Sequence, residues 1–173
     1  MNVAWCITGA EMFLRETIEL IMEIGPDSTE LFLSKSATEI LTRYGLIEKI
    51  KQFKMYRDDE ASLFQITRLF SGRFNKVVIA PCSTNTVAKM AHGISDNLVT
   101  NIFSQANKIK LPIYILPSDT AEVMQFQTKS GKTHILFQRK IDRENIKKLK
   151  KFENVKVLNA LKDLQKLFTA ERK

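Results

Sequence analysis

A short apolar segment followed at once by a polar cluster constrains this chain more than any other feature. Residues 77–80 have the composition of a buried strand, and residues 81–86 read Pro-Cys-Ser-Thr-Asn-Thr. Proline has no N–H to donate to a sheet, so we expect the strand to end there. Ser, Thr and Asn are preferred at helix N-caps, where the first N–H groups lack partners within the helix. The pattern therefore predicts a buried strand leading into a helix N-terminus suited to an anion or a polar ring edge.

The rest of the chain alternates short apolar segments with longer amphipathic ones. This alternation predicts a parallel sheet with helices on both faces, and ligands in such sheets bind beyond the carboxyl ends of the strands. We expect strands at residues 3–8, 31–33, 77–80, 112–116 and 155–158. We expect helices at 13–24, 36–44, 63–70, 96–108, 142–151 and 160–168, with a short one near 46–53 and a polar stretch at 56–60.

Residues 122–128 and 133–140 depart from this alternation. They flank Lys-Ser-Gly-Lys at 129–132, a sequence typical of a hairpin turn. We therefore expect a short antiparallel excursion that lies over the carboxyl edge of the parallel sheet.

Length and composition indicate one globular domain over residues 1–173, because 44% of the residues are hydrophobic. No apolar run approaches the roughly 20 residues of a membrane helix, and the first nine residues lack the basic start of a signal peptide. The two cysteines, Cys6 and Cys82, have no metal-type spacing. These features predict a cytoplasmic protein with neither a membrane segment nor a metal centre.

Positive charge is concentrated at the C-terminal end of the chain. The whole chain has a net charge of +8, and residues 139–173 contain twelve Lys and Arg against five Asp and Glu, a net charge of +7. The segment reads either as a solvated helix face or as a docking patch for an acidic protein. Nucleic acid is not expected, because no aromatic residues interleave with the basic ones in a binding motif.

Three predicted strand ends carry the candidate ligand contacts. A glycine at such an end lets backbone approach a ligand closely, whereas hydroxyl and amide side chains either bind the ligand or only cap the following helix. The chain has neither Gly-x-Gly-x-x-Gly nor a Walker A sequence, which favours a mononucleotide over a dinucleotide or ATP. The candidate residues are Thr8, Gly9, Ala10, Ser34, Ser36, Ser83, Thr84, Asn85 and Thr86.

Residues 81–98 resemble the signature of the FMN-binding flavoproteins that include cysteine decarboxylases, flavin prenyltransferases and archaeal flavoproteins. The matching parts are the Pro-Cys-Ser-Thr-Asn-Thr run and the later Gly-Ile-Ser-Asp-Asn-Leu at 93–98. The resemblance implies FMN as cofactor, with Ser34 at its phosphate. It also implies a Rossmann-like or flavodoxin-like three-layer sandwich: a mostly parallel sheet with the short hairpin as its antiparallel part.

The differences between the branches of this family point to the archaeal one. Residues 11–91 contain no histidine, and Pro-Ser-Asp-Thr at 117–120 replaces the clamp of the decarboxylases. Ser118 stands where the prenyltransferases have an arginine. Residues 3–10, 72–78 and 139–145 resemble the archaeal, dihydromethanopterin reductase-like branch, although Glu11-Met12 stands where that branch commonly has glycine.

The implied function is electron transfer or reduction by an FMN protein. It would accept electrons from a reduced carrier such as a ferredoxin and pass them to a pterin or another small-molecule acceptor. The resemblance also implies a homotrimer or a dodecamer. The alternatives are a prenyltransferase-like transferase and a non-enzymatic FMN-binding module. No catalytic side chain is assigned; Lys89 or His92 could tune the flavin, and we expect His92 to be satisfied at a subunit contact.

Overall fold

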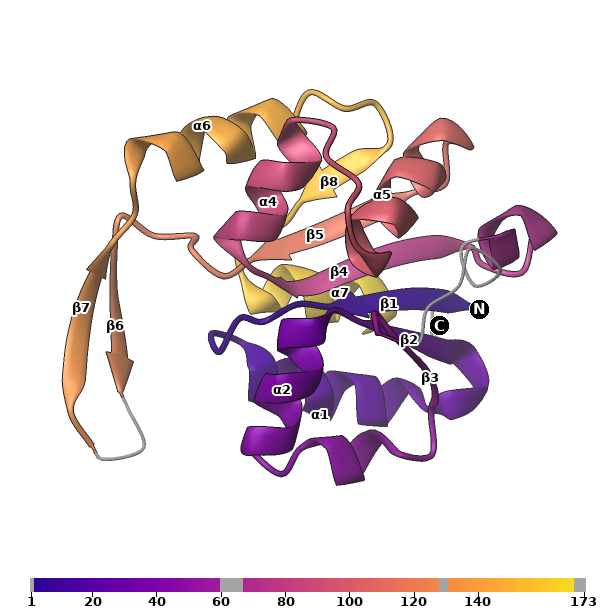
Figure 1. Cartoon of the computed structure of the whole chain (residues 1–173), viewed down its shortest axis with the longest axis horizontal. Coiled ribbons are helices and arrows are strands. Elements are labelled where there is room, and N and C mark those ends of the chain that lie inside the picture. The colour runs from indigo at the N-terminus through magenta and orange to yellow at the C-terminus, as the bar shows by residue number, and fades with distance from the viewer. Residues whose placement is uncertain (1, 60–66, 128–130, 170–173) are drawn as a thin grey trace.

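The computed structural model describes residues 2–59, 67–127 and 131–169. Its centre is a sheet of six parallel strands in the order β3-β2-β1-β4-β5-β8 (Figure 1). This arrangement confirms the predicted parallel α/β fold. The strands are β1 (Val3–Ile7), β2 (Thr29–Leu33), β3 (Lys54–Arg57), β4 (Lys76–Cys82), β5 (Ile113–Pro117) and β8 (Val155–Val157).

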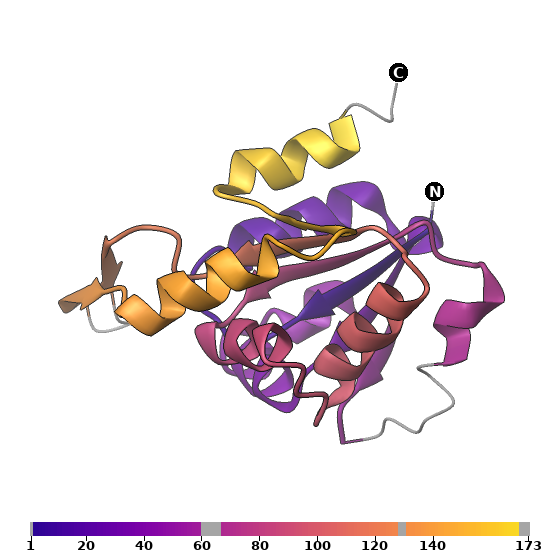
Figure 2. The same cartoon turned by 90° about the horizontal axis from the view of Figure 1, so that it is seen from above.

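Helices cover both faces of this sheet, as the view along its plane shows (Figure 2). None of the helices in the described ranges is long and apolar enough to cross a bilayer. The α-helices are α1 (Leu14–Ile24), α2 (Lys35–Arg43), α4 (Thr84–Ala91), α5 (Leu98–Lys108), α6 (Lys140–Leu149) and α7 (Leu161–Thr169). Short 3-10 turns are η1 (Pro26–Ser28), η2 (Ile47–Ile50) and η3 (Arg68–Ser71).

Strand β1 shows how the sequence builds two cores. All five of its residues are buried, and alternate side chains point to opposite faces of the sheet. Val3, Trp5 and Ile7 belong to one apolar cluster with residues of α1, α2 and α7. Ala4 and Cys6 belong to a second cluster with residues of α4, α5 and α6. A central strand buried on both faces is typical of a doubly covered parallel sheet.

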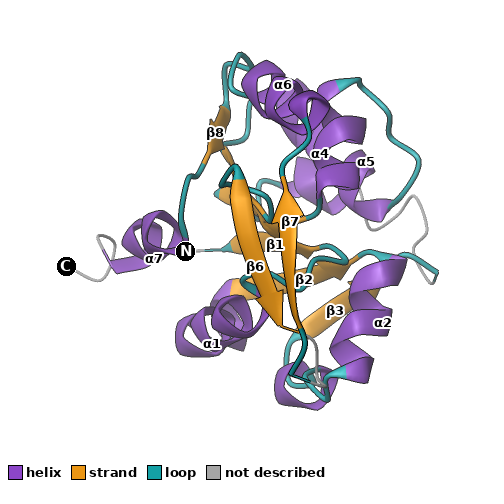
Figure 3. Ribbon diagram, turned by 90° about the vertical axis from the view of Figure 1, so that its left-hand side faces the viewer, coloured by secondary structure: helices purple, strands orange, loops and turns teal. Residues whose placement is uncertain are grey.

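The hairpin predicted after β5 is also confirmed. Strands β6 (Val123–Gln127) and β7 (Thr133–Phe137) pair antiparallel and form a separate two-stranded sheet. The hairpin stands off from the carboxyl edge of the main sheet, in front of the strand ends (Figure 3). Part of the expected turn, residues 128–130, lies outside the described residues.

The end of β4 differs from the prediction. The strand continues through Pro81 to Cys82 instead of ending at residue 80, with a register irregularity against β5 between Ile79 and Cys82. Proline removes a donor but keeps its acceptor, and the Pro81 carbonyl accepts a hydrogen bond from the Thr8 N–H at 3.2 Å. This hydrogen bond connects Pro81 to the residue that follows β1, and it keeps β4 paired with its neighbour beyond the proline.

Two elements between residues 45 and 75 were also wrongly predicted. Strand β3 begins directly after the expected helix and runs into the expected polar stretch, because a short and partly exposed edge strand has little apolar signal. The helix expected at 46–53 is only the 3-10 turn η2. The first half of the helix expected at 63–70 lies outside the described residues, and its last part belongs to the 3-10 turn η3.

Candidate functional site

The ends of β1 and β4 are joined by the hydroxyl of Thr8. Its Oγ1 donates to the Pro81 carbonyl at 2.9 Å and accepts from the backbone N–H of Ser83 at 2.7 Å. Thr8 is only 1% exposed, and both hydrogen bonds of its hydroxyl are made to other parts of the protein. It fixes the position of the loops that follow both strands.

Gly9 brings the loop after β1 against the start of α2. A Cβ atom built on Gly9 would lie 2.4 Å from the Cβ of Ser36, a separation that two such atoms cannot adopt. Ser34 caps the same helix, since its Oγ accepts from the backbone N–H of Ala37 at 3.1 Å. The N-terminus of α2 is therefore held directly beside the end of β1.

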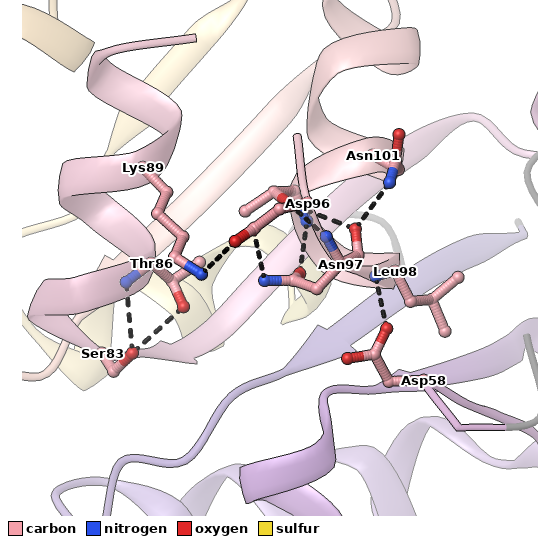
Figure 4. Close-up of polar contacts among 9 residues, drawn as sticks. Asp58, Ser83, Thr86, Lys89, Asp96, Asn97, Leu98 and Asn101 are labelled. Atoms are coloured by element: carbon pink, nitrogen blue, oxygen red, sulfur yellow. Dashed lines mark hydrogen bonds and ion pairs between the residues drawn. The ribbon is translucent and has the colours of Figure 1, made fainter. Parts of the chain in front are cut away.

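Helix α4 begins at the same edge, after β4. The Ser83 Oγ accepts from the Thr86 N–H at 3.3 Å and lies 3.0 Å from the Thr86 hydroxyl (Figure 4). Thr84 is half-buried and Asn85 is exposed. Two helices thus direct their positive N-terminal ends toward the carboxyl edge of the sheet, where an anion is stabilised.

These strand ends form one wall of a pocket of about 330 Å³, and the hairpin forms the facing wall. The loop after β5 closes it from the side. The lining residues are Gly9, Ala10, Glu11, Met12, Ser83, Thr84, Ser118, Asp119, Met124 and Leu136.

Of the predicted site residues, Gly9, Ala10, Ser83 and Thr84 line this pocket. The remaining five do not line it. Thr8 and Thr86 are buried behind the wall and support it, Ser34 and Ser36 lie at the start of α2, and Asn85 faces solvent at the start of α4.

Several lining residues were not predicted as ligand contacts. Ser118 and Asp119 follow β5, so the rule that ligands bind beyond strand ends could have included them. Glu11 and Met12 were recognised only as a departure from the resembled branch. Met124 and Leu136 come from the hairpin, and only tertiary folding places these two apolar side chains opposite the strand ends.

Two carboxylates lie in the pocket in different surroundings. Asp119 accepts from the Ser118 hydroxyl at 2.8 Å, and its carbonyl accepts from Gln138 at 2.6 Å. One oxygen of Glu11, Oε2, is buried without a hydrogen-bond partner in the described structure. Burial and a hydrogen bond to the Glu11 carboxylate raise the pKa of Tyr44. The Glu11 carboxylate thus accepts a hydrogen bond from Tyr44, and its Oε2 can still accept another from a ligand.

The second half of the signature segment builds α5 instead of the pocket (Figure 4). Asn97 caps this helix in a capping box with Thr100, and the Leu98 N–H donates to Asp58 at 2.7 Å. Lys89 lies 2.6 Å from Asp96, and this hydrogen bond lowers the pKa of Asp96. Lys89 therefore positions the loop between α4 and α5.

His92 has two partners within the chain, and the expected subunit contact stays a prediction. Its Nε2 lies 3.0 Å from the Asn145 side-chain oxygen, and its Nδ1 lies 3.5 Å from the Lys148 Nζ. Both partners belong to α6, which packs against α4. His92 joins these two helices and does not line the pocket.

The fold is that of a flavodoxin-like α/β protein, with a pocket at the carboxyl edge of a parallel sheet. The sequence profile of the Flavoprotein family matches residues 1–171. The chain therefore belongs to the Flavoprotein family.

Three similar proteins relate this chain to known activities. The FMN complex of Burkholderia xenovorans DmrB, described as a cubic protein cage for redox transfer, superposes with a TM-score of 0.87 at 36% identity; the match covers 99% of this chain and 94% of DmrB. The dihydromethanopterin reductase (acceptor) of Methanosarcina mazei is 34% identical over 68% of this chain. The flavin prenyltransferase UbiX of Methanocaldococcus jannaschii is 27% identical over 69% of this chain and 66% of its own length.

The match to the Methanosarcina mazei reductase covers only part of that protein. The match spans 55% of the Methanosarcina mazei protein, so about half of that reductase has its counterpart here. The DmrB match, in contrast, runs through nearly the whole of both chains.

Proposed function

We propose that the pocket binds FMN and that the protein is an FMN-dependent reductase or electron carrier. Electrons would pass from a reduced carrier such as a ferredoxin to a pterin or another small-molecule acceptor. The observation that carries this proposal is the pairing of the Gly9–Ser83 wall with the hairpin wall in a fold that DmrB, solved with FMN, shares over nearly its whole length.

The residues present fit a flavin mononucleotide. Two helix N-termini offer N–H donors to its phosphate, with Ser34, Ser36, Thr84 and Asn85 beside them. Gly9 lines the pocket, and its missing side chain lets the start of α2 lie directly beside it. When bound, FMN would supply the hydride or electron transfer, and the protein would supply binding, orientation and electrostatics.

The hairpin and the loop after β5 would shape the acceptor side. Met124 and Leu136 present apolar surface that excludes water from the pocket, whereas Asp119 presents a carboxylate held by Ser118. A prenyltransferase-like activity is less favoured, because a prenyl phosphate requires cationic side chains and position 118 is serine.

We infer that the carrier docks on the basic C-terminal segment. Lys148 and Lys151 of this segment line a hollow near the C-terminal end of α6 together with Lys110 and Glu153. Lys110 pairs with Glu153 at 3.8 Å, so Lys148 and Lys151 supply the positive charge for an acidic protein. A small ferredoxin has the matching charge for such a surface.

We also infer that the chain assembles as a homotrimer or dodecamer. The outer face of the hairpin exposes Val123, Ile135 and Phe137, which are 54%, 57% and 72% exposed. Apolar side chains gathered in this way indicate a contact surface. DmrB, the redox protein of similar fold, is described as a cage.

A cytoplasmic setting fits the two thiols. Cys6 and Cys82 are free and fully buried, and burial raises the pKa of both. Free, unreactive thiols are the usual state of cysteines in a reducing compartment.

The decisive experiment is an absorbance spectrum of the purified protein, with the released cofactor identified by mass. Flavin bands with the mass of FMN support the proposal, and reduction by ferredoxin followed by reoxidation with a dihydropterin substrate tests the activity. A colourless protein that also fails to bind added FMN would overturn it.

The variant Asn85→Ala tests the phosphate end. The Asn85 side chain is exposed and makes no hydrogen bond with a described residue, so its removal should leave the free energy of unfolding unchanged. Because we place this side chain beside the FMN phosphate, its removal should weaken FMN binding about fivefold to a hundredfold. Gln165→Ala, which removes an exposed amide from α7, is the matched control and should alter neither quantity.

A further inference from the structure

A second hollow, which we call the α6 groove, lies beside the proposed cofactor pocket. It has a volume of about 180 Å³ and runs between α6 and the ends of β5 and β8. Its apolar floor includes Pro117, Val157 and Leu158, and the polar side chains of Thr120, Gln138 and Asn159 stand at its rim.

One side of the groove is formed by three cations, Arg143 and Lys147 on α6 and Lys150 at its C-cap. Arg143, Lys147 and Lys150 have the spacing i, i+4 and i+7, which places them on one helix face. Arg143 is paired with Glu122 at 3.7 Å. The side-chain ammonium groups of Lys147 and Lys150 make no ion pair or hydrogen bond with any described residue, and their charge is therefore uncompensated within the described structure.

No lining residue of the groove is acidic. The carboxylate of Asp163, which follows β8 in the chain, accepts from the backbone N–H of the lining residue Asn159 at 3.3 Å. The groove thus combines positive charge, neutral donors and an apolar floor. This combination suits an anionic group attached to a larger molecule better than a free cation or a neutral ring.

The groove and the cofactor pocket are neighbours because they share one loop. Pro117 and Thr120 line the groove, whereas Ser118 and Asp119, between them in sequence, line the pocket. A molecule with its reducible part in the pocket can therefore reach the groove with another part.

We propose that the α6 groove binds an anionic group with at least two negative charges, a phosphate or a pair of carboxylates, on the small-molecule acceptor. The role as an acceptor subsite rests on the proposed reductase function, whereas anion binding in the groove does not. A neutral acceptor would gain nothing from Lys147 and Lys150, so the groove selects acceptors by their charge.

The test is calorimetric titration of the protein loaded with FMN, so that the phosphate end of the pocket is filled. Inorganic pyrophosphate and citrate serve as probes of the two anion types, at low salt. We expect the wild-type protein to bind at least one of the two anions. The double variant Lys147→Ala/Lys150→Ala should bind that anion with an affinity about tenfold weaker. Lys162→Ala/Lys166→Ala removes the same charge from α7 and should bind like wild type.

Each outcome is decisive for the groove. Pyrophosphate binding tighter than citrate identifies a phosphate group, and the reverse identifies carboxylates. Absence of binding to the wild type, or equal weakening in both double variants, overturns the proposal. So does slower reduction by ferredoxin in Lys147→Ala/Lys150→Ala with unchanged binding of both anions, because the lysines would then serve the protein carrier.

The failure of this proposal is distinguishable from failure of the reductase function. A protein that holds FMN and turns over but ignores both anions retains the function and loses the subsite. A protein that never binds FMN loses the function, and its anion binding is then measured on the unloaded chain with the same variants.

Discussion

The two walls of the main pocket are built in opposite ways. The strand-end wall is held by short hydrogen bonds through Thr8 and by the direct packing of Gly9 on Ser36. The hairpin wall is a two-stranded ribbon whose outer face exposes Ile135 and Phe137. One wall is complete within the chain, whereas the other leaves apolar surface for something else to cover.

This difference assigns the walls different tasks. A cofactor that stays bound needs a surface preorganised by the fold, and the strand-end wall provides it. A two-stranded hairpin is marginally stable alone, so its position depends on what packs against it. Changes in the strand-end wall should therefore alter folding and FMN binding together, whereas changes on the outer hairpin face should alter assembly.

The largest effect is expected at Gly9. Gly9→Ala introduces a Cβ that meets Ser36, and this overpacking should lower the free energy of unfolding by about 1–3 kcal/mol and impair FMN binding. Urea unfolding and flavin titration measure the two effects.

The double variant Gly9→Ala/Ser36→Gly removes the atom that causes the clash, and Ser36→Gly alone is its reference. A positive coupling between the two changes is expected. Purely additive losses would show that the close contact between Gly9 and Ser36 is unimportant.

A somewhat smaller effect is expected for Thr8→Val. The isosteric valine removes the donor to Pro81 and leaves the Ser83 N–H without its acceptor, which should lower the free energy of unfolding by about 1–2 kcal/mol. Thr8→Ser keeps the hydroxyl and should retain most of the stability. A loss in Thr8→Ser alone, with Thr8→Val as stable as the wild type, would assign the effect to the methyl group and contradict the prediction.

The base of the hairpin offers a test by pH. Arg139 binds Asp142 through two hydrogen bonds of 2.8 Å, and this contact lowers the pKa of Asp142 in the folded protein. The stability it contributes is complete above the unfolded pKa of about 3.9 and is lost as the pH falls through the folded value.

Asp142→Asn should therefore destabilise the protein at neutral pH, by less than Thr8→Val, and flatten the fall in stability below about pH 4. Thermal unfolding between pH 3 and pH 7 measures this. An acid transition identical to that of wild type would mean that the pair does not control it.

The smallest effect on the free energy of unfolding is expected at Phe137. Its side chain is 72% exposed, so Phe137→Ser should change the stability of the isolated chain by less than about 0.5 kcal/mol. The same variant should lower the assembled mass in light scattering. Phe70→Ser removes another exposed phenylalanine, on η3, and should leave the mass unchanged.

The sequence predicted the structure correctly where a residue type strongly favours one kind of structure. Alternating apolar segments predicted the parallel sheet, and hydroxyl residues after strands predicted capped helices there, although the cap of α2 is Ser34 and not the first residue of the expected helix. It misled at Pro81, because the missing N–H was read as an end while the carbonyl still joins the strand to Thr8. It also missed β3, whose partly exposed residues give no apolar pattern.

By itself, the sequence determined the α/β class, the edge of the sheet where the site lies, and Gly9, Ala10, Ser83 and Thr84 as pocket residues. These properties follow from local patterns: period, capping and the special freedom of glycine. Only the tertiary structure decided that Met124 and Leu136 face the strand ends, that His92 pairs with α6, and that three cations share a groove with the ends of β5 and β8. These contacts join residues far apart in sequence, and their partners are set by how helices and the hairpin pack on the sheet.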